Sequence, residues 1–292
     1  MKAIVIGAGI GGLASAIRLR NLGYEVEVFE ANSNPGGKLH SFSIGPYRFD
    51  GGPSLFTMPQ YVVELFRASQ IDPEKYFDFH ECEEACRYMW EDGHRLTAPS
   101  NPAEFSQLAA DEFEIDSSEI RGYFDHVKNI YDHSGKIFLE QSLHKFKTWA
   151  SMETMKSLMK IGQFDLFKSM NAANIDRVQE PHLVQLFNRF ATYNGSNPYK
   201  APGILNVIPW LEHGFGTYFP KGGMQSIPNA LYNAGKDLGV QYHFDCRVES
   251  IQTTGKKVDG VQAGGKFHNA DIVISNMDVY FTYSKLLSQI SP

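Results

Sequence analysis

Three glycines near the start of the chain have a spacing that suits phosphate binding. Residues 7–12 read GAGIGG, which matches the pattern G-x-G-x-x-G. In this pattern Gly7 permits a tight turn, Gly9 lets the backbone approach a pyrophosphate, and Gly12 permits close packing between a helix and a strand. Glu30 follows at the spacing at which a carboxylate accepts hydrogen bonds from ribose hydroxyls. The combination predicts a site for a dinucleotide.

These residues work only if local structure holds them in place. The apolar, β-branched run Lys2–Ile6 predicts a buried strand, and Gly11–Leu22 predicts a helix that ends at Gly23. Glu25–Phe29 predicts a second, parallel strand that leads to the acid. Because strand, glycines, helix, strand and acid occur in register, the pattern is far more specific than the glycines alone.

The character of the sequence changes twice along the chain and predicts two domains. Residues 1–60 and 217–292 have α/β character, with a helix expected over 226–238 and short strands after it. Residues 61–216 are helix-rich, with one hairpin expected around Asp92-Gly93. The predicted fold class is therefore α/β: a discontinuous Rossmann-like domain with an inserted helix-rich domain.

Composition narrows the class of protein. The 292 residues include 27 basic and 33 acidic side chains, a net charge of −6, so no nucleic-acid partner is expected. Three scattered cysteines favour a reducing compartment. The first strand begins directly after Met1, which leaves no room for a signal peptide, and no apolar run is long enough to span a bilayer. We therefore expect a cytoplasmic protein. Cys82, Cys86 and His80 lack a second ligand pair, so no metal site is predicted.

A second glycine pair indicates which dinucleotide is bound. Asn34–Lys38 reads NPGGK and follows Glu30 closely. This arrangement resembles flavoproteins of the amine-oxidase-like superfamily, in which Gly-Gly-Arg/Lys after the ribose-binding glutamate continues the cofactor site. A carboxylate at position 30 also disfavours the 2′-phosphate of NADP. The expected cofactor is FAD, bound by the discontinuous α/β domain.

Several longer segments are similar to one family. They are Tyr47–Ser54, Arg189–Pro198, Gly216–Met224 and Ala270–Asn276, and they resemble bacterial-type phytoene desaturases and their carotenoid-oxidoreductase relatives. Gly52–Pro59 is more similar to enzymes that desaturate hydroxylated carotenoids at the 3,4 position. Members of the family are usually longer, and a C-terminal segment completes the flavin-ring half of the site. The chain thus looks like an N-terminal portion, with the adenine and ribose half of the site present.

The resemblance implies an FAD-dependent oxidoreductase that removes hydrogen from a C40 polyene by hydride transfer to flavin, with quinone or oxygen as reoxidant. The inserted domain would line an apolar substrate tunnel. No catalytic residue is assigned: Arg189, Tyr193 and His213 are equally suited to structural roles, and Asp50 is either a base or a turn residue. The implied FAD-binding residues are Gly7, Gly9, Gly12, Glu30, Gly36, Gly37, Lys38, Gly52 and Val248.

One stretch of the inserted domain has two interpretations. Residues 135–170 carry six lysines against three acids, with Phe, Trp, Met and Leu near helical spacing. Such a segment suits docking on the anionic inner face of a membrane, from which a polyene must be drawn. It is equally typical of helices that pack their apolar face inside the domain and leave lysines in water.

Two alternative functions remain open at this stage. One is a carotenoid cis–trans isomerase that needs flavin without net redox change. The other is a non-catalytic fragment that binds FAD or an apolar ligand without turnover.

Overall fold

The computed structural model describes residues 1–142 and 144–287, which form two compact units. Unit 1 comprises residues 1–80 together with the chain from Tyr218 onward, and unit 2 comprises Glu81–Thr217. The first boundary thus differs from the expected 60/61. The reason is that α2 (Gln60–Ala68) and the segment after it bury Leu65, Phe66 and Phe77 in the core of unit 1.

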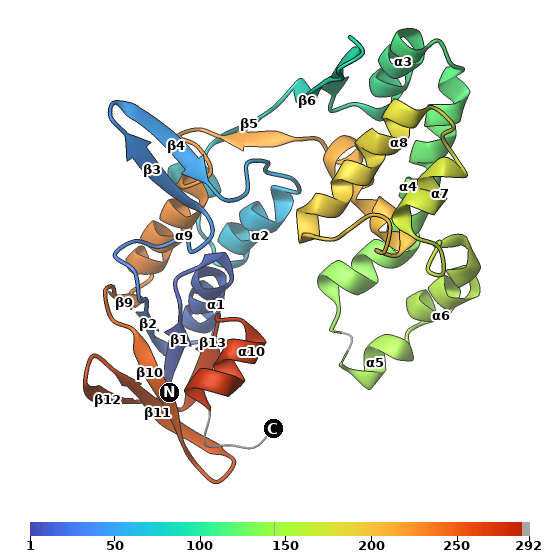
Figure 1. The fold of residues 1–292 in the computed structure, drawn as a ribbon. Coiled ribbons are helices and arrows are strands. Elements are labelled where there is room, and N and C mark those ends of the chain that lie inside the picture. The colour runs from blue at the N-terminus through green and yellow to red at the C-terminus, as the bar shows by residue number, and fades with distance from the viewer. Residues whose placement is uncertain (143, 288–292) are drawn as a thin grey trace. The chain divides into compact units, whose positions relative to one another are not determined.

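Unit 1 is built around a parallel sheet of four strands in the order β13-β1-β2-β9 (Figure 1). β1 (Lys2–Ile6) and β2 (Glu25–Phe29) have the bounds that the sequence predicts. β13 (Ile272–Ser275) pairs with β1, and β9 (Gln241–His243) pairs with β2. Both outer strands therefore come from the part of the chain that follows unit 2.

Both faces of this sheet are covered. On one face Ala3 and Val5 pack against the helices α1 (Ile10–Asn21) and α9 (Ser226–Asp237). On the other face Ile4 and Ile6 pack against an antiparallel sheet of β10 (Val248–Thr254), β11 (Lys257–Ala263) and β12 (Lys266–Asn269). Burial on both sides explains why residues 3–6 of β1 form an unbroken apolar run, whereas β2 keeps Glu25 and Glu27 among its apolar residues. It confirms the predicted α/β fold class.

Two pairings in unit 1 are not among the sequence predictions. β3 (His40–Ile44) and β4 (Tyr47–Gly51) form a hairpin in which Phe42 lies opposite Phe49. β5 (Phe79–Glu81) pairs with β8 (Tyr218–Pro220). A short helix α10 (Val279–Phe281) follows β13.

Unit 2 is helical around an aromatic core. Phe105, Tyr123, Phe124, Phe187 and Phe190 are buried together. The expected hairpin is present as β6 (Glu84–Met89) and β7 (Arg95–Pro99). The helices are α3 (Pro102–Phe113), α4 (Ser117–Glu140), α5 (Phe146–Trp149), α6 (Met152–Met159), α7 (Met170–Ile175) and α8 (Pro181–Asn188). Across residues 1–142 and 144–287, no helix has both the length and the apolarity to span a bilayer.

An ion-paired histidine makes the stability of unit 2 depend on pH. His182 in α8 lies 2.7 Å from Glu180 through Nδ1 and 2.7 Å from Asp92 through Nε2. The hydrogen bond to Glu180, and then that to Asp92, raise the pKa of His182 above its ordinary value of 6.5. His94, paired with Glu112, packs beside the His182 ring.

We expect the free energy of unfolding to fall as the pH rises from about 6.5 through the raised pKa of His182. The protonated imidazole pairs with Glu180 and Asp92 only in the folded state, and deprotonation removes that stabilisation. His182→Gln should flatten this slope in urea unfolding measured at several pH values. The control is His144→Gln, at an exposed position. An unchanged slope in His182→Gln would contradict the prediction.

Candidate cofactor site

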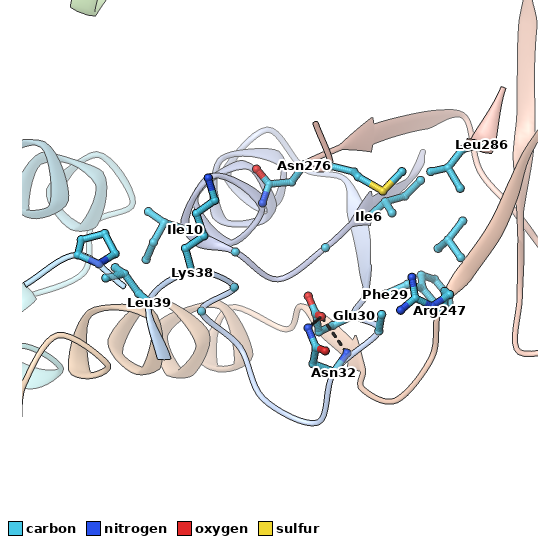
Figure 2. A pocket seen from close by; sticks show the side chains of 18 residues that line it. Ile6, Ile10, Phe29, Glu30, Asn32, Lys38, Leu39, Arg247, Asn276 and Leu286 are labelled. Carbon is cyan, nitrogen blue, oxygen red and sulfur yellow. Dashed lines mark hydrogen bonds between the residues drawn. The ribbon is translucent and has the colours of Figure 1, made fainter. Parts of the chain in front are cut away.

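A cavity of about 560 Å³ opens at the carboxyl ends of β1 and β2 in unit 1 (Figure 2). This is the edge at which open α/β sheets bind ligands, and the volume lies in the range of small-molecule sites. Four stretches of chain line most of it: the glycine loop after β1, the segment from Glu30 to Leu39, the pair Arg247-Val248, and the pair Asn276-Met277.

The glycine loop is shaped by close backbone packing. Gly7 has a φ of +93°, which favours glycine, and α1 begins just after Gly9. A Cβ atom on Gly12 would lie 2.0 Å from the carbonyl oxygen of Gly7, so only glycine fits there. The first turn of α1 holds no acidic residue and no side-chain cap. Its N–H groups and positive dipole end therefore favour an anion.

The carboxylate of Glu30 is buried and held in a fixed orientation. Its Oε2 accepts a hydrogen bond from the N–H of Ala8 at 2.7 Å. Its Oε1 accepts bonds from the N–H and side-chain Nδ2 of Asn32 at 2.9 and 2.7 Å (Figure 2). A carboxylate has about four acceptor positions, so acceptor capacity remains for ribose hydroxyls.

The second glycine pair lies beside the first loop. The N–H of Gly36 donates to the carbonyl of Ala8 at 2.8 Å, and a Cβ on Gly37 would lie 3.4 Å from the Cα of Gly9. Lys38 follows, and its exposed side chain lies at the cavity (Figure 2). An ammonium group here complements a pyrophosphate.

Some of the expected FAD-binding residues line the cavity, and others support the backbone segments that line it. Gly12 and Gly52 do not line the cavity: Gly12 packs on Gly7, and a Cβ on Gly52 would lie 2.0 Å from the carbonyl oxygen of Lys38. Gly52 thus supports the Lys38 segment, and Pro53 is on the cavity wall. Of the expected residues, those that line the cavity are Gly7, Gly9, Glu30, Gly36, Gly37, Lys38 and Val248.

Three polar residues line the cavity but are not among the FAD-binding residues expected from the sequence: Asn32, Arg247 and Asn276. Asn32 orients Glu30, as described above. Asn276 directly follows β13, whose last residue pairs with Ile6. Neighbouring parallel strands end at the same edge of a sheet. The position of Asn276 directly after a predicted strand could therefore have indicated that it lies at the cavity.

Asp50 has a structural role in this arrangement. Its Oδ2 accepts from the N–H of Met224 at 2.9 Å, and its Oδ1 accepts from Arg48 at 2.8 Å. The bond from Met224 fastens β4 to the loop before α9, whereas the bond from Arg48 lies within β4. Of the two roles considered for Asp50, the geometry supports turn stabilisation.

A buried polar cluster in unit 2 brings together the residues whose roles were open. Glu212 lies in a π-helical turn, Trp210–Gly214, and is fully buried. It accepts hydrogen bonds from the hydroxyl of Tyr193 and from Arg189 Nη2, the latter at 3.3 Å. Burial, and then the charge of Glu212, raise the pKa of Tyr193. His213 is also buried and donates from Nδ1 to the carbonyl of Pro99 at 3.0 Å.

The basic stretch of unit 2 has an inverted burial pattern. In α6 the polar Thr154 and Ser157 are buried, 2% and 8% exposed, whereas Met152, Met155 and Met159 are 70%, 57% and 80% exposed. Thr154 donates to the carbonyl of Thr148 at 2.7 Å. These three methionines of α6 thus face outward. Leu143 and the side chains of Lys136, Phe138, Glu153 and Leu158 lie outside the described residues.

The close approach at Gly12 has a measurable consequence. We expect Gly12→Ala to lower the free energy of unfolding by about 1–3 kcal/mol, because its Cβ meets backbone that has no room to move. A Cβ on Gly122, inside α4, would meet no atom within 4 Å, so Gly122→Ala should raise stability by about 0.5–1 kcal/mol. Urea unfolding measures both. Equal stability of Gly12→Ala and the unaltered chain would refute the packing argument.

The sequence matches named carotenoid enzymes along its whole length. It is 44% identical over 291 residues to a 1-hydroxycarotenoid 3,4-desaturase of Flavobacterium sp. (strain P99-3), which covers 99% of this chain and 59% of the relative. It is 32% identical to a 4,4′-diapolycopene oxygenase of Methylomonas sp, covering 98% of this chain and 57% of the relative. It is 31% identical to a zeta-carotene-forming phytoene desaturase of Myxococcus xanthus, covering 98% and 55%. The chain therefore spans less than two thirds of the length of these curated relatives.

Solved structures share the fold at lower identity. An oxidoreductase from Methanosarcina mazei superposes with a TM-score of 0.65 at 22% identity, covering 100% of this chain and 62% of that one. Putrescine oxidase bound to putrescine gives a TM-score of 0.65 at 18% identity, covering 98% and 60%. The profile of the flavin containing amine oxidoreductases matches residues 10–289. Since that match covers nearly the whole chain, the protein belongs to the flavin-containing amine oxidoreductase family.

Proposed function

We propose that this chain acts in an FAD-dependent desaturase of C40 carotenoids. The observation that carries the proposal is the 44% identity, along 99% of the chain, to a relative named as a 1-hydroxycarotenoid 3,4-desaturase. Identity to the phytoene desaturase is lower, at 31%, which favours a 1-hydroxylated polyene as the substrate.

The cavity in unit 1 fits the adenosine-diphosphate half of FAD. Glu30 would accept from the ribose hydroxyls, and Val248 and Phe29 would offer apolar surface to the adenine. The N-terminus of α1 and Lys38 would hold the pyrophosphate. A bound flavin supplies a two-electron acceptor, which side chains do not provide.

The reaction that we propose removes one hydride and one proton from adjacent carbons of the polyene, so that a single bond becomes a double bond. A bound flavin would accept the hydride, quinone or oxygen would reoxidise it, and the proton would go to solvent. No described side chain is assigned to accept the proton. The contribution of this chain is to bind and orient the cofactor.

We further propose that unit 2 attaches the protein peripherally to the cytoplasmic face of a membrane, where a polyene dissolves. We call residues 144–168 the methionine segment. Its exposed large apolar side chains adjoin lysines in sequence, as in surface-binding helices. Polar groups buried beneath exposed methionines are hard to reconcile with a surface that meets only water. The residues concerned are Phe146, Met152, Met155, Met159, Phe167, Lys145, Lys147 and Lys156.

Flavin retention tests the cofactor site. The purified chain, incubated with FAD and desalted, should keep near-equimolar flavin by its visible absorption. Glu30→Ala should weaken FAD binding by about tenfold or more, because it removes the acceptor of the ribose hydroxyls. Glu25→Ala, at the exposed start of β2, the strand that precedes Glu30, is the control and should bind FAD normally.

The same preparation then tests the reaction. Anaerobic incubation of the FAD-loaded chain with a 1-hydroxylated C40 polyene should shift the polyene absorption to longer wavelength, as conjugation grows. A change of double-bond geometry without longer conjugation would contradict desaturation and indicate an isomerase. Retained flavin with unchanged polyene would contradict turnover by this chain.

Vesicle binding tests the methionine segment. The chain should co-sediment with vesicles that contain phosphatidylglycerol, and less with phosphatidylcholine alone or at high salt. Met152→Ser should weaken binding by about tenfold, because a buried Met contributes roughly 1.5–3 kcal/mol. Met89→Ser is the matched control, since Met89 and Met152 are both 70% exposed. If both variants lose vesicle binding equally, or if Met152→Ser binds vesicles normally, the methionine segment is not the membrane-binding surface.

A further inference from the structure

Asn276 lies where β13 meets the glycine loop. Its backbone N–H donates to the carbonyl of Ile6 at 2.8 Å, which fixes it beside the end of β1. Its side chain extends over the loop: Nδ2 would lie 2.8 Å from a Cβ on Gly9, and Oδ1 would lie 2.6 Å from a Cβ on Gly11. Figure 2 shows the carboxamide at the start of α1, on the cavity.

The carboxamide of Asn276 has unused hydrogen-bonding capacity. Within the described part of the chain it makes no hydrogen bond, although it offers two N–H donors. Gly9 therefore has Asn276 near one side and the Gly37–Lys38 segment near another. A neutral donor and a cation thus flank the place where the second glycine of the motif lets a pyrophosphate approach.

We propose that Asn276 donates a hydrogen bond from Nδ2 to the pyrophosphate of the bound dinucleotide. This role deepens the proposed function and rests on its cofactor. It makes β13, from the far end of the chain, part of the cofactor site together with the loop after β1. Asn276 is a binding residue and takes no part in proton or hydride transfer.

A packing role is the competing explanation, and two substitutions separate it from the proposal. Asn276→Ala removes the donor and the bulk. Asn276→Asp keeps the shape but places a carboxylate against the phosphates. A packing residue tolerates Asp better than Ala, whereas a phosphate-binding residue tolerates Asp less well. Asn269→Ala, at an exposed position in β12, is the matched control.

The experiment measures dissociation constants of adenosine, ADP and FAD by calorimetry, with thermal unfolding as a check on folding. We expect Asn276→Ala to weaken ADP and FAD about tenfold and to leave adenosine unchanged, because adenosine has no phosphate. Asn276→Asp should weaken ADP and FAD further, and salt should reduce that additional loss. Asn269→Ala should match the unaltered chain.

Each other outcome overturns a distinct claim. If the unaltered chain binds neither ADP nor FAD, the cofactor site itself is wrong, and the role of Asn276 falls with it. If it binds both and the Asn276 variants bind equally well, only the role of Asn276 is wrong. Tighter binding by Asn276→Asp than by Asn276→Ala would indicate packing. Tighter binding by Asn276→Ala than by the unaltered chain would indicate a side chain that obstructs the site. Either result overturns the proposal.

Discussion

The cofactor edge of unit 1 depends on one close backbone approach, in which Gly12 packs against the carbonyl oxygen of Gly7. This contact sets how near the first turn of α1 comes to the end of β1. It also places Ala8, whose N–H holds the carboxylate of Glu30 and whose carbonyl receives the N–H of Gly36. The acid, the second glycine pair and the helix N-terminus are therefore all positioned by a single turn. Any atom added there disturbs all three together.

The parts of the fold that sequence reasoning predicted are those specified by neighbouring residues. β1, α1 and β2 follow one another with a clear apolar run, a glycine turn and a glycine stop, so their bounds agree closely with expectation. β5 and β8 have no such signal. Each strand has only three residues, and nearly all of the sequence of unit 2 separates them along the chain. The β3–β4 hairpin leaves Phe42 and Phe49 46% and 44% exposed, so its pattern does not indicate a buried face.

The residues of the site also divide into those that the sequence predicted and those that it did not. Motif spacing brought Glu30 and the glycine pairs to one cavity. Gly52, which only the family resemblance implies, lies outside the lining of this cavity and packs against the carbonyl oxygen of Lys38. Arg247 and Asn276 were missed because their relation to the loop exists only after β9, β10 and β13 are in place. Periodicity also identified α6 without indicating which side faces out, since Thr154 and Ser157 find hydrogen-bond partners only in the folded unit.

The discontinuity of unit 1 has a consequence for how the chain folds. During synthesis β1 and β2 leave the ribosome before unit 2, and all of unit 2 follows before β9 and β13 exist. Unit 2 has its own core and can fold early, whereas the β1–β2 pair waits with both edges unpaired. Unpaired apolar strands are prone to join other chains. The long separation between sheet partners also slows their pairing, which makes completion of the parallel sheet the vulnerable step in biogenesis.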